Sequence, residues 1–204
     1  MESERYVNYD LQPGEDTLLH TYMPTSVHDW VLVDLWGKMQ RDRSLEGSIL
    51  TNAQTLHAFM SLLAHPGETR FALDAQGPYF CTWCEPVMSG ISLGLWVRED
   101  KRKSRQCLIF GHQVFAELFK RYKVILVITR DETTKQFHEH FGFTFGCVIP
   151  YIYDGDSAYI SFLTKETYEK KFQGRALPLA GEEEYSQWDV SRYLDIFAKQ
   201  KGER

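Results

Sequence analysis

The order of elements in this chain is decided by residues 91–129, which read ISLGLWVREDKRKSRQCLIFGHQVFAELFKRYKVILVIT. Residues 91–97 are mostly apolar and predict a strand, which a charged loop follows. Residues 104–121 carry apolar side chains at helical spacing, and residues 123–129 form the β-branched run of a buried central strand. Because a helix joins the two strands, we expect them to be parallel neighbours in one sheet.

The flanking sequence adds strands before this unit and after it. A helix with apolar positions from 56 to 63 is expected to start at an N-cap at Thr51 or Asn52. Strands are predicted at 69–75, 79–85, 144–154 and 157–165, and a short helix begins at Asp131 and ends at Gly142. This order predicts an α/β (α+β) domain, with a mixed central sheet flanked by helices.

Length and composition indicate one globular domain. The chain has 204 residues and a formal net charge of -5, which argues against a general nucleic-acid binder. No apolar run reaches the roughly 18 residues of a membrane span, and the polar N-terminus lacks signal-peptide features. We therefore expect a cytoplasmic protein, with an irregular extension at 1–50, a core at 51–172 and a tail at 173–204. The tail contains an expected amphipathic helix at 190–200.

Cys81 and Cys84 form a CxxC pair, which suggests zinc or redox chemistry. A structural zinc site usually needs a second pair of ligands, and none follows in the sequence. On a strand, residues three apart point to opposite faces of the sheet. We therefore expect no metal at this pair.

The charged loop between the strand and the long helix is the first candidate site. A strand that runs into a helix N-terminus presents free backbone N–H groups and the positive end of the helix dipole. The loop adds Lys101, Arg102, Lys103 and Arg105. A diphosphate is the ligand that such a site suits, and an exposed basic loop without a ligand is the alternative.

The segment 97–109 resembles the acetyl-CoA loop of the GNAT N-acetyltransferases, whose usual form is V-x-P-E-Y-R-G-K-G-I-G-R-A. Arg102 matches the first arginine, whereas Lys103, Arg105 and Cys107 stand at usual glycine positions. Glycine lets the backbone approach the pyrophosphate closely. We expect the side chains at these three positions to occupy that space, so that acyl-CoA binding is weak or lost.

The segment 127–146, VITRDETTKQFHEHFGFTFG, is similar to a second GNAT pattern, V-x-x-x-N-x-x-A-x-x-x-Y-E-K-x-G-F-x-x-x-G. Asp131 stands at the asparagine and His138 at the tyrosine. The direct matches are Glu139, Gly142 and Phe143, and Gly146 lies one residue before the final glycine position. The resemblance covers about residues 51–165, and it implies that the two parallel strands splay apart at one end.

The resemblance also implies roles for individual residues. Backbone N–H groups near Leu95 and Val97 would polarise the thioester carbonyl of an acyl-CoA, which is an oxyanion-hole role. His138 would protonate the thiolate or relay a proton, with a surface histidine of no function as the alternative. Glu85 is the expected base, and a solvent-facing carboxylate is the alternative. The expected coenzyme contacts are Arg102, Lys103, Ser104, Arg105, Cys107 and Asp131.

Three functions stay open at this stage. The first is an acyl-CoA-dependent N-acyltransferase that acts on an amine. The second is a non-catalytic protein of the same fold, which would bind a protein partner through aromatic-rich or terminal segments. The third is a nucleobase-modifying enzyme. The lysine- and arginine-rich loop also resembles divergent GNAT-like phage proteins, among them small internal virion proteins of short-tailed phages, which implies the host cytoplasm or a virion. The missing glycines favour the second function.

Overall fold

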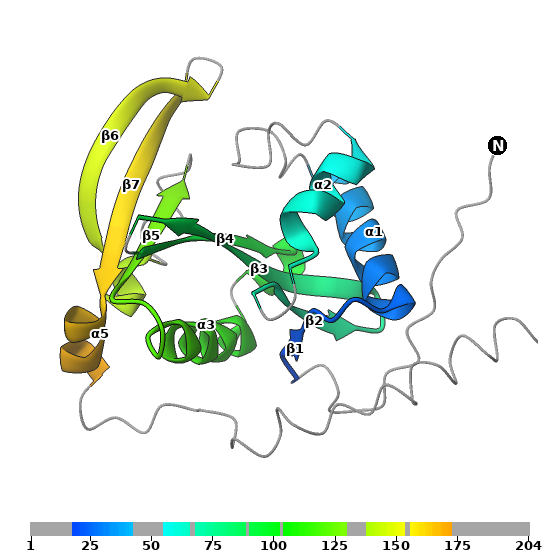
Figure 1. The fold of residues 1–204 in the computed structure, drawn as a ribbon, viewed down its shortest axis with the longest axis horizontal. Coiled ribbons are helices and arrows are strands. Elements are labelled where there is room, and N and C mark those ends of the chain that lie inside the picture. Colours follow the sequence, from blue (N-terminus) through cyan, green and yellow to red (C-terminus); the bar gives the residue numbers. More distant parts are fainter. Residues whose placement is uncertain are drawn as a thin grey trace, which may run out of the picture.

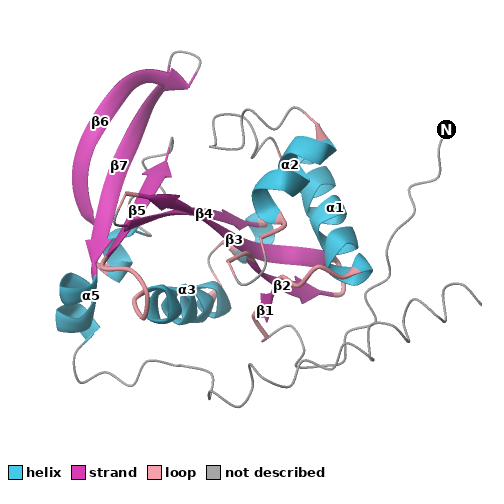
Figure 2. Ribbon diagram, in the orientation of Figure 1, coloured by secondary structure: helices cyan, strands magenta, loops and turns pink. Residues whose placement is uncertain are grey.

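The computed structural model of the chain describes residues 18–42, 55–65, 68–88, 90–102, 104–129, 138–153 and 156–172. In these ranges it forms one mixed seven-stranded sheet, in the order β1-β2-β3-β4-β5-β7-β6, with helices on both faces (Figures 1 and 2). The elements are β1 (His20–Thr21), α1 (Ser26–Arg41), α2 (Leu56–Leu63), β2 (Arg70–Asp74), β3 (Gly77–Val87), β4 (Gly90–Val97), the 3-10 helix η3 (Glu99–Lys101), α3 (Arg105–Leu118), β5 (Val124–Thr129), β6 (Thr144–Tyr153), β7 (Asp156–Thr164) and α5 (Lys165–Phe172).

The parallel pairing of β4 and β5 confirms the expected crossover. Ile91 pairs with Ile125 and Ser92 with Leu126, and the pairing stops there. Both strands continue for at least three more residues. There, among the described residues, β4 pairs only with β3, and β5 pairs only with β7. The two strands therefore splay apart after Ser92, as the resemblance implied.

The expectation of an irregular segment at 1–50 is wrong, because β1 and α1 lie within it. Thr25 caps α1 by accepting a hydrogen bond from the amide of His28 at 3.3 Å. The side chains of α1 that face the sheet are buried at helical spacing: Val27, Val31, Leu32, Leu35 and Met39. The next helix, α2, is capped by Thr55 and not by Thr51 or Asn52.

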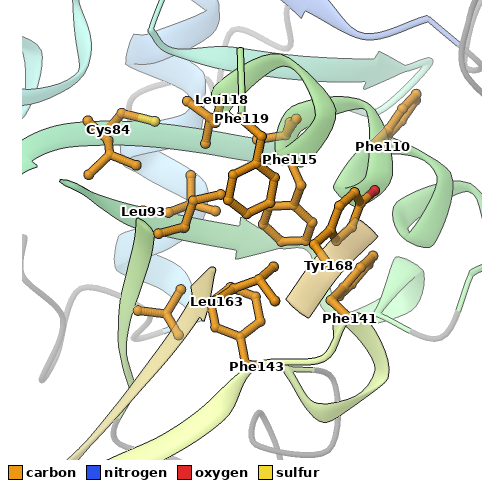
Figure 3. Close-up of a cluster of buried hydrophobic side chains, with 14 of the residues drawn as sticks. Cys84, Leu93, Phe110, Phe115, Leu118, Phe119, Phe141, Phe143, Leu163 and Tyr168 are labelled. Atoms are coloured by element: carbon orange, nitrogen blue, oxygen red, sulfur yellow. The ribbon is translucent and has the colours of Figure 1, made fainter. Parts of the chain in front are cut away.

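Each face of the sheet carries its own hydrophobic core. The core under α1 and α2 contains Cys81, whereas the core under α3 and α5 contains Cys84, which confirms that the two thiols point to opposite faces. Figure 3 shows part of the second core, where Phe115, Phe141 and Tyr168 pack together. Side chains buried to this extent contribute about 1.5–3 kcal/mol each, so the two cores hold the helices on the sheet without a disulfide.

The helix α5 is an element that the sequence did not predict. Tyr168 and Phe172 are its buried residues, and the Tyr168 hydroxyl lies 2.9 Å from Nδ1 of His112 on α3. The predicted helix at 190–200 and the hairpin turn at 154–155 lie outside the described residues. Within the residues that the structure describes, no helix is long and apolar enough to cross a membrane.

Candidate functional site

The part of β4 beyond Ser92 presents backbone donors toward β5. The Arg98 amide donates to the Tyr79 carbonyl at 2.9 Å. This bond shows that residues at even positions of β4 point their backbone N–H and C=O groups toward β3. Residues at odd positions of β4, including Leu95 and Val97, therefore turn their N–H and C=O groups away from β3. Because β5 does not pair with β4 there, these amides lie where a ligand strand or a thioester carbonyl could accept from them.

The loop after β4 is held by ion pairs within the chain. The Arg98 guanidinium binds both carboxylate oxygens of Asp74, at 3.0 Å and 2.5 Å, and its Nε lies 2.7 Å from Asp100 Oδ1. Lys101 Nζ lies 3.3 Å from Asp74. Burial alone would raise the pKa of Asp74, but hydrogen bonds and charge from Arg98 outweigh burial and lower it. Arg98 and Lys101 are therefore neutralised largely by the chain itself.

One amide of the first turn of α3 is also engaged. Ser104 Oγ accepts from the Cys107 amide at 3.3 Å, so Ser104 is the N-cap and takes a donor that a phosphate would otherwise use. The Cys107 side chain is only 1% exposed and lies in the core beneath α3. The expectation that this side chain occupies the pyrophosphate space is wrong. Burial also raises the pKa of its thiol.

Of the other residues expected to contact coenzyme A, Arg102 is exposed and donates from Nε to the Val97 carbonyl at 3.2 Å. This bond ties the loop back to the end of β4. Lys103, Asp131 and the side chain of Arg105 lie outside the described part of the structure.

His138 is not a surface residue. It is 5% exposed, and its ring lies 5.2 Å from the ring of Phe143. Burial lowers the pKa of His138 to about 4, so the imidazole is neutral near pH 7. A neutral imidazole can pass a proton between two partners, but it is a poor source of a proton for a thiolate.

Glu85 lies on the opposite face of the sheet from α3, directly across from Ser92 in the β3–β4 ladder. Side chains in such a pair have Cβ atoms about 4.5–5.5 Å apart. Glu85 Oε1 and Ser92 Oγ are both buried, and neither has a hydrogen-bond partner among the described residues. Ser92 is also the last residue of β4 that pairs with β5, so this polar pair lies where the strands diverge.

An aromatic side chain lies on the next position of the same face. A Cβ added at Gly94 would lie 1.9 Å from Trp83 Cε2, so the indole rests directly on the backbone of β4. Trp83 Nε1 is buried and has no hydrogen-bond partner in the described part of the chain. Neither Ser92 nor Trp83 was predicted as a site residue. Ser92 is brought opposite Glu85 only by the β3–β4 register, whereas Trp83 lies two residues before Glu85 on the same strand and therefore on the same face.

The described residues contain no group of three or more His, Cys, Asp or Glu side chains placed to hold a metal ion. Burial raises the pKa of both thiols, to about 12 for Cys84 and further for Cys81. Buried, protonated thiols on opposite faces of a strand are poor metal ligands and poor nucleophiles.

Comparison with solved structures finds the same fold in several acetyltransferases. Ard1 from Thermoplasma volcanium matches with a TM-score of 0.58 and 12% identity over 72% of this chain and 96% of that chain. The ribosomal-protein-S18-alanine N-acetyltransferase from Escherichia coli matches with a TM-score of 0.54 and 15% identity over 81% of this chain and 96% of that chain. An aminoglycoside 6'-N-acetyltransferase complexed with coenzyme A matches with a TM-score of 0.55 and 14% identity over 72% of this chain and 96% of that chain.

The chain therefore has the GNAT acetyltransferase fold, as the resemblance of its loop and of residues 127–146 implied. Outside residues 51–165, β1 belongs to the same sheet and α1 to the core on one of its faces. No protein-family model and no curated protein sequence matches the chain.

Proposed function

We propose that the chain is an acyl-CoA-dependent N-acyltransferase that binds its thioester between the diverging ends of β4 and β5. The observation that carries this proposal is the unpaired stretch of β4, where the N–H groups of Leu95 and Val97 turn toward β5. Fixed amide dipoles of this kind stabilise the negative charge that develops on a carbonyl oxygen during acyl transfer. Such donors need no reorganisation when the charge forms.

The acyl-CoA supplies an activated carbonyl carbon and a thiolate leaving group, and the protein supplies position and charge. Holding the amine and the thioester together accounts for most of the acceleration in such a transfer. Glu85 faces the point of divergence with a buried oxygen and is the group we assign to take a proton from the ammonium. His138, neutral by burial, is assigned to relay a proton and not to donate one as an imidazolium.

The phosphate half of the coenzyme fits this chain poorly. Asp74 and Asp100 hold Arg98, and Ser104 occupies the amide of Cys107. Arg102 is exposed beside the helix start and is the described cation that we assign to the diphosphate. We therefore expect coenzyme A to bind more weakly than a glycine-rich loop would allow, since each charge-assisted backbone hydrogen bond that is lost costs roughly 1.5–3 kcal/mol.

The same features support a second candidate, a non-catalytic protein of this fold that binds a partner. A neutralised loop and a capped helix start are what a chain keeps when the fold is needed and the coenzyme is not. A phage-encoded virion component or host-cytoplasmic protein is the finer form of this candidate, and it rests only on the lysine- and arginine-rich loop sequence. A nucleobase-modifying enzyme has no described feature that favours it over the other two.

Calorimetry with acetyl-CoA, coenzyme A and adenosine diphosphate separates the first two candidates. The transferase predicts weak but saturable binding of acetyl-CoA, with a dissociation constant above the micromolar range, and release of free thiol when an amine is added. The non-catalytic protein predicts no binding of either coenzyme form. Micromolar or tighter binding would show that the charged loop is a working coenzyme clamp and would overturn our account of it.

A further inference from the structure

An apolar strip continues the sheet face on which Glu85 and Ser92 lie. Ser92 pairs with Leu126, and Leu126 pairs with Phe162, so these three side chains point to the same side of the sheet. Two residues further along, Ile128 pairs with Ile160. We call Leu126, Ile128, Ile160 and Phe162 the β5–β7 strip.

The β5–β7 strip is not part of either hydrophobic core. Its four side chains are half-buried and belong to neither of the two clusters of buried residues. The helices α1 and α2 lie on this side of the sheet but pack over β2, β3 and β4 (Figures 1 and 2). Within the described ranges, the strip therefore remains partly exposed while the equivalent face beside it is covered.

The carboxylate of Glu85 lies at one end of the strip. Glu85 Oε1 and Ser92 Oγ are buried acceptors without a described partner, and they lie at the end of the strip where β4 and β5 diverge. A carboxylate with a buried, unpartnered oxygen is stabilised by a cation with several N–H donors, and a primary ammonium is such a cation. The four residues of the strip carry no charge and no hydrogen-bonding side chain, so they offer nothing to a second charged group.

We propose that the acyl acceptor is a primary amine carried on one apolar group, such as an arylalkyl- or alkylamine. The ammonium lies between Glu85 and Ser92, and the apolar body covers Leu126 and Phe162. This inference rests on the proposed transferase function. Polyamines and aminoglycosides are disfavoured, because their further ammonium or hydroxyl groups would be desolvated against the strip without partners.

Binding to the full chain tests the acceptor class without coenzyme. Phenethylamine, its neutral analogue 2-phenylethanol and the polyamine spermidine are titrated by calorimetry. We expect phenethylamine to bind about tenfold or more tightly than either of the others, because it alone satisfies both the carboxylate and the strip. Equal binding of phenylethanol, preference for spermidine, or no binding of phenethylamine would each overturn the inference.

Two pairs of variants assign the contacts. Glu85→Gln keeps the size of the side chain but removes its charge, and it should weaken phenethylamine binding about tenfold. Glu166→Gln, at an exposed position of α5, is its control and should change nothing. Phe162→Ala should weaken binding of the same amine, whereas Phe145→Ala, on the other face of the neighbouring strand, should not. Unchanged binding in Glu85→Gln or Phe162→Ala contradicts the proposed placement.

Release of thiol from acetyl-CoA distinguishes failure of this inference from failure of the proposed function. Thiol release with phenethylamine supports both. Thiol release with spermidine but not with phenethylamine leaves the transferase standing and overturns the acceptor class. Binding of phenethylamine that depends on Glu85, without thiol release from acetyl-CoA, supports the amine site and overturns the transferase.

Discussion

Replacing Asp74 with Asn removes the charge that orders the loop between β4 and α3. Asp74 accepts two hydrogen bonds from Arg98 and lies 3.3 Å from Lys101 Nζ, and the Asp74 and Arg98 side chains are each 14% exposed. A hydrogen bond to a charged group contributes about 1.5–3 kcal/mol, and Asn keeps one acceptor oxygen. We therefore expect Asp74→Asn to lower the free energy of unfolding by about 2 kcal/mol.

Asp100 provides a matched control, because it binds the same guanidinium from a more exposed position. Its side chain is 52% exposed, and an ion pair at such a site contributes about 0–1 kcal/mol. Urea unfolding of the two variants measures both costs. A loss of stability in Asp100→Asn as large as in Asp74→Asn, or no loss in Asp74→Asn, would refute the reasoning that burial of the Asp74 pair anchors the loop.

Three further outcomes are expected. Burial lowers the pKa of His28 from 6.5 to about 4, so the unfolded chain takes up a proton at a higher pH than the folded chain does. The free energy of unfolding should therefore fall by on the order of 3 kcal/mol for this group as the pH drops from 6.5 to 4. In urea unfolding, His28→Gln should make the free energy of unfolding less dependent on pH over this range. Gly94→Ala should lower the free energy of unfolding by about 1–3 kcal/mol, because the added Cβ would overlap Trp83. Gly37→Ala should instead raise it by about 0.5–1 kcal/mol, because the added Cβ meets only a flexible arginine nitrogen at 3.4 Å within α1. Equal unfolding midpoints for the two variants would contradict this. Arg105→Gly should strengthen coenzyme A binding in calorimetry, and unchanged binding would show that the missing glycine is not what limits affinity.

The elements with strong local periodicity were predictable from the sequence. Three elements are recognisable from about ten residues of local sequence each: the apolar strand β4, the helical pattern of α3 and the β-branched run of β5. Their order predicts the parallel crossover. Cys107 shows the value of that local evidence. Its helical spacing with Phe110 and Val114 marks it as a core residue, which is where it lies, whereas the motif alignment placed it in the coenzyme loop.

The helices α1 and α5 were missed for opposite reasons. The sequence of α1 contains a dense apolar run with β-branched residues such as Val31, which obscures its helical period and resembles a strand. The sequence of α5, KETYEKKF, is so polar that only Tyr168 and Phe172, four residues apart, reveal its buried side. In both helices, tertiary packing determines the structure more than local preference does.

The candidate site was predictable only in part. Leu95 and Val97 follow from the position of the strand before a charged loop, and Glu85 from its place on the preceding strand. The pairing of Glu85 with Ser92 depends on the β3–β4 register, and the neutral state of His138 depends on the burial of its ring in the folded chain. The ion pairs of Asp74 likewise join β2 to a loop more than twenty residues later, which no local pattern indicates.

Amide NMR during a titration with acetyl-CoA tests the central claim most directly. We predict that the backbone N–H resonances of Leu95 and Val97 shift progressively and saturate with a dissociation constant above the micromolar range. The amide resonances of Cys81 and Cys84, on the paired part of β3, should not shift. Resonances of β4 that do not move at any acetyl-CoA concentration would contradict the claim that the diverging strands β4 and β5 form the thioester site.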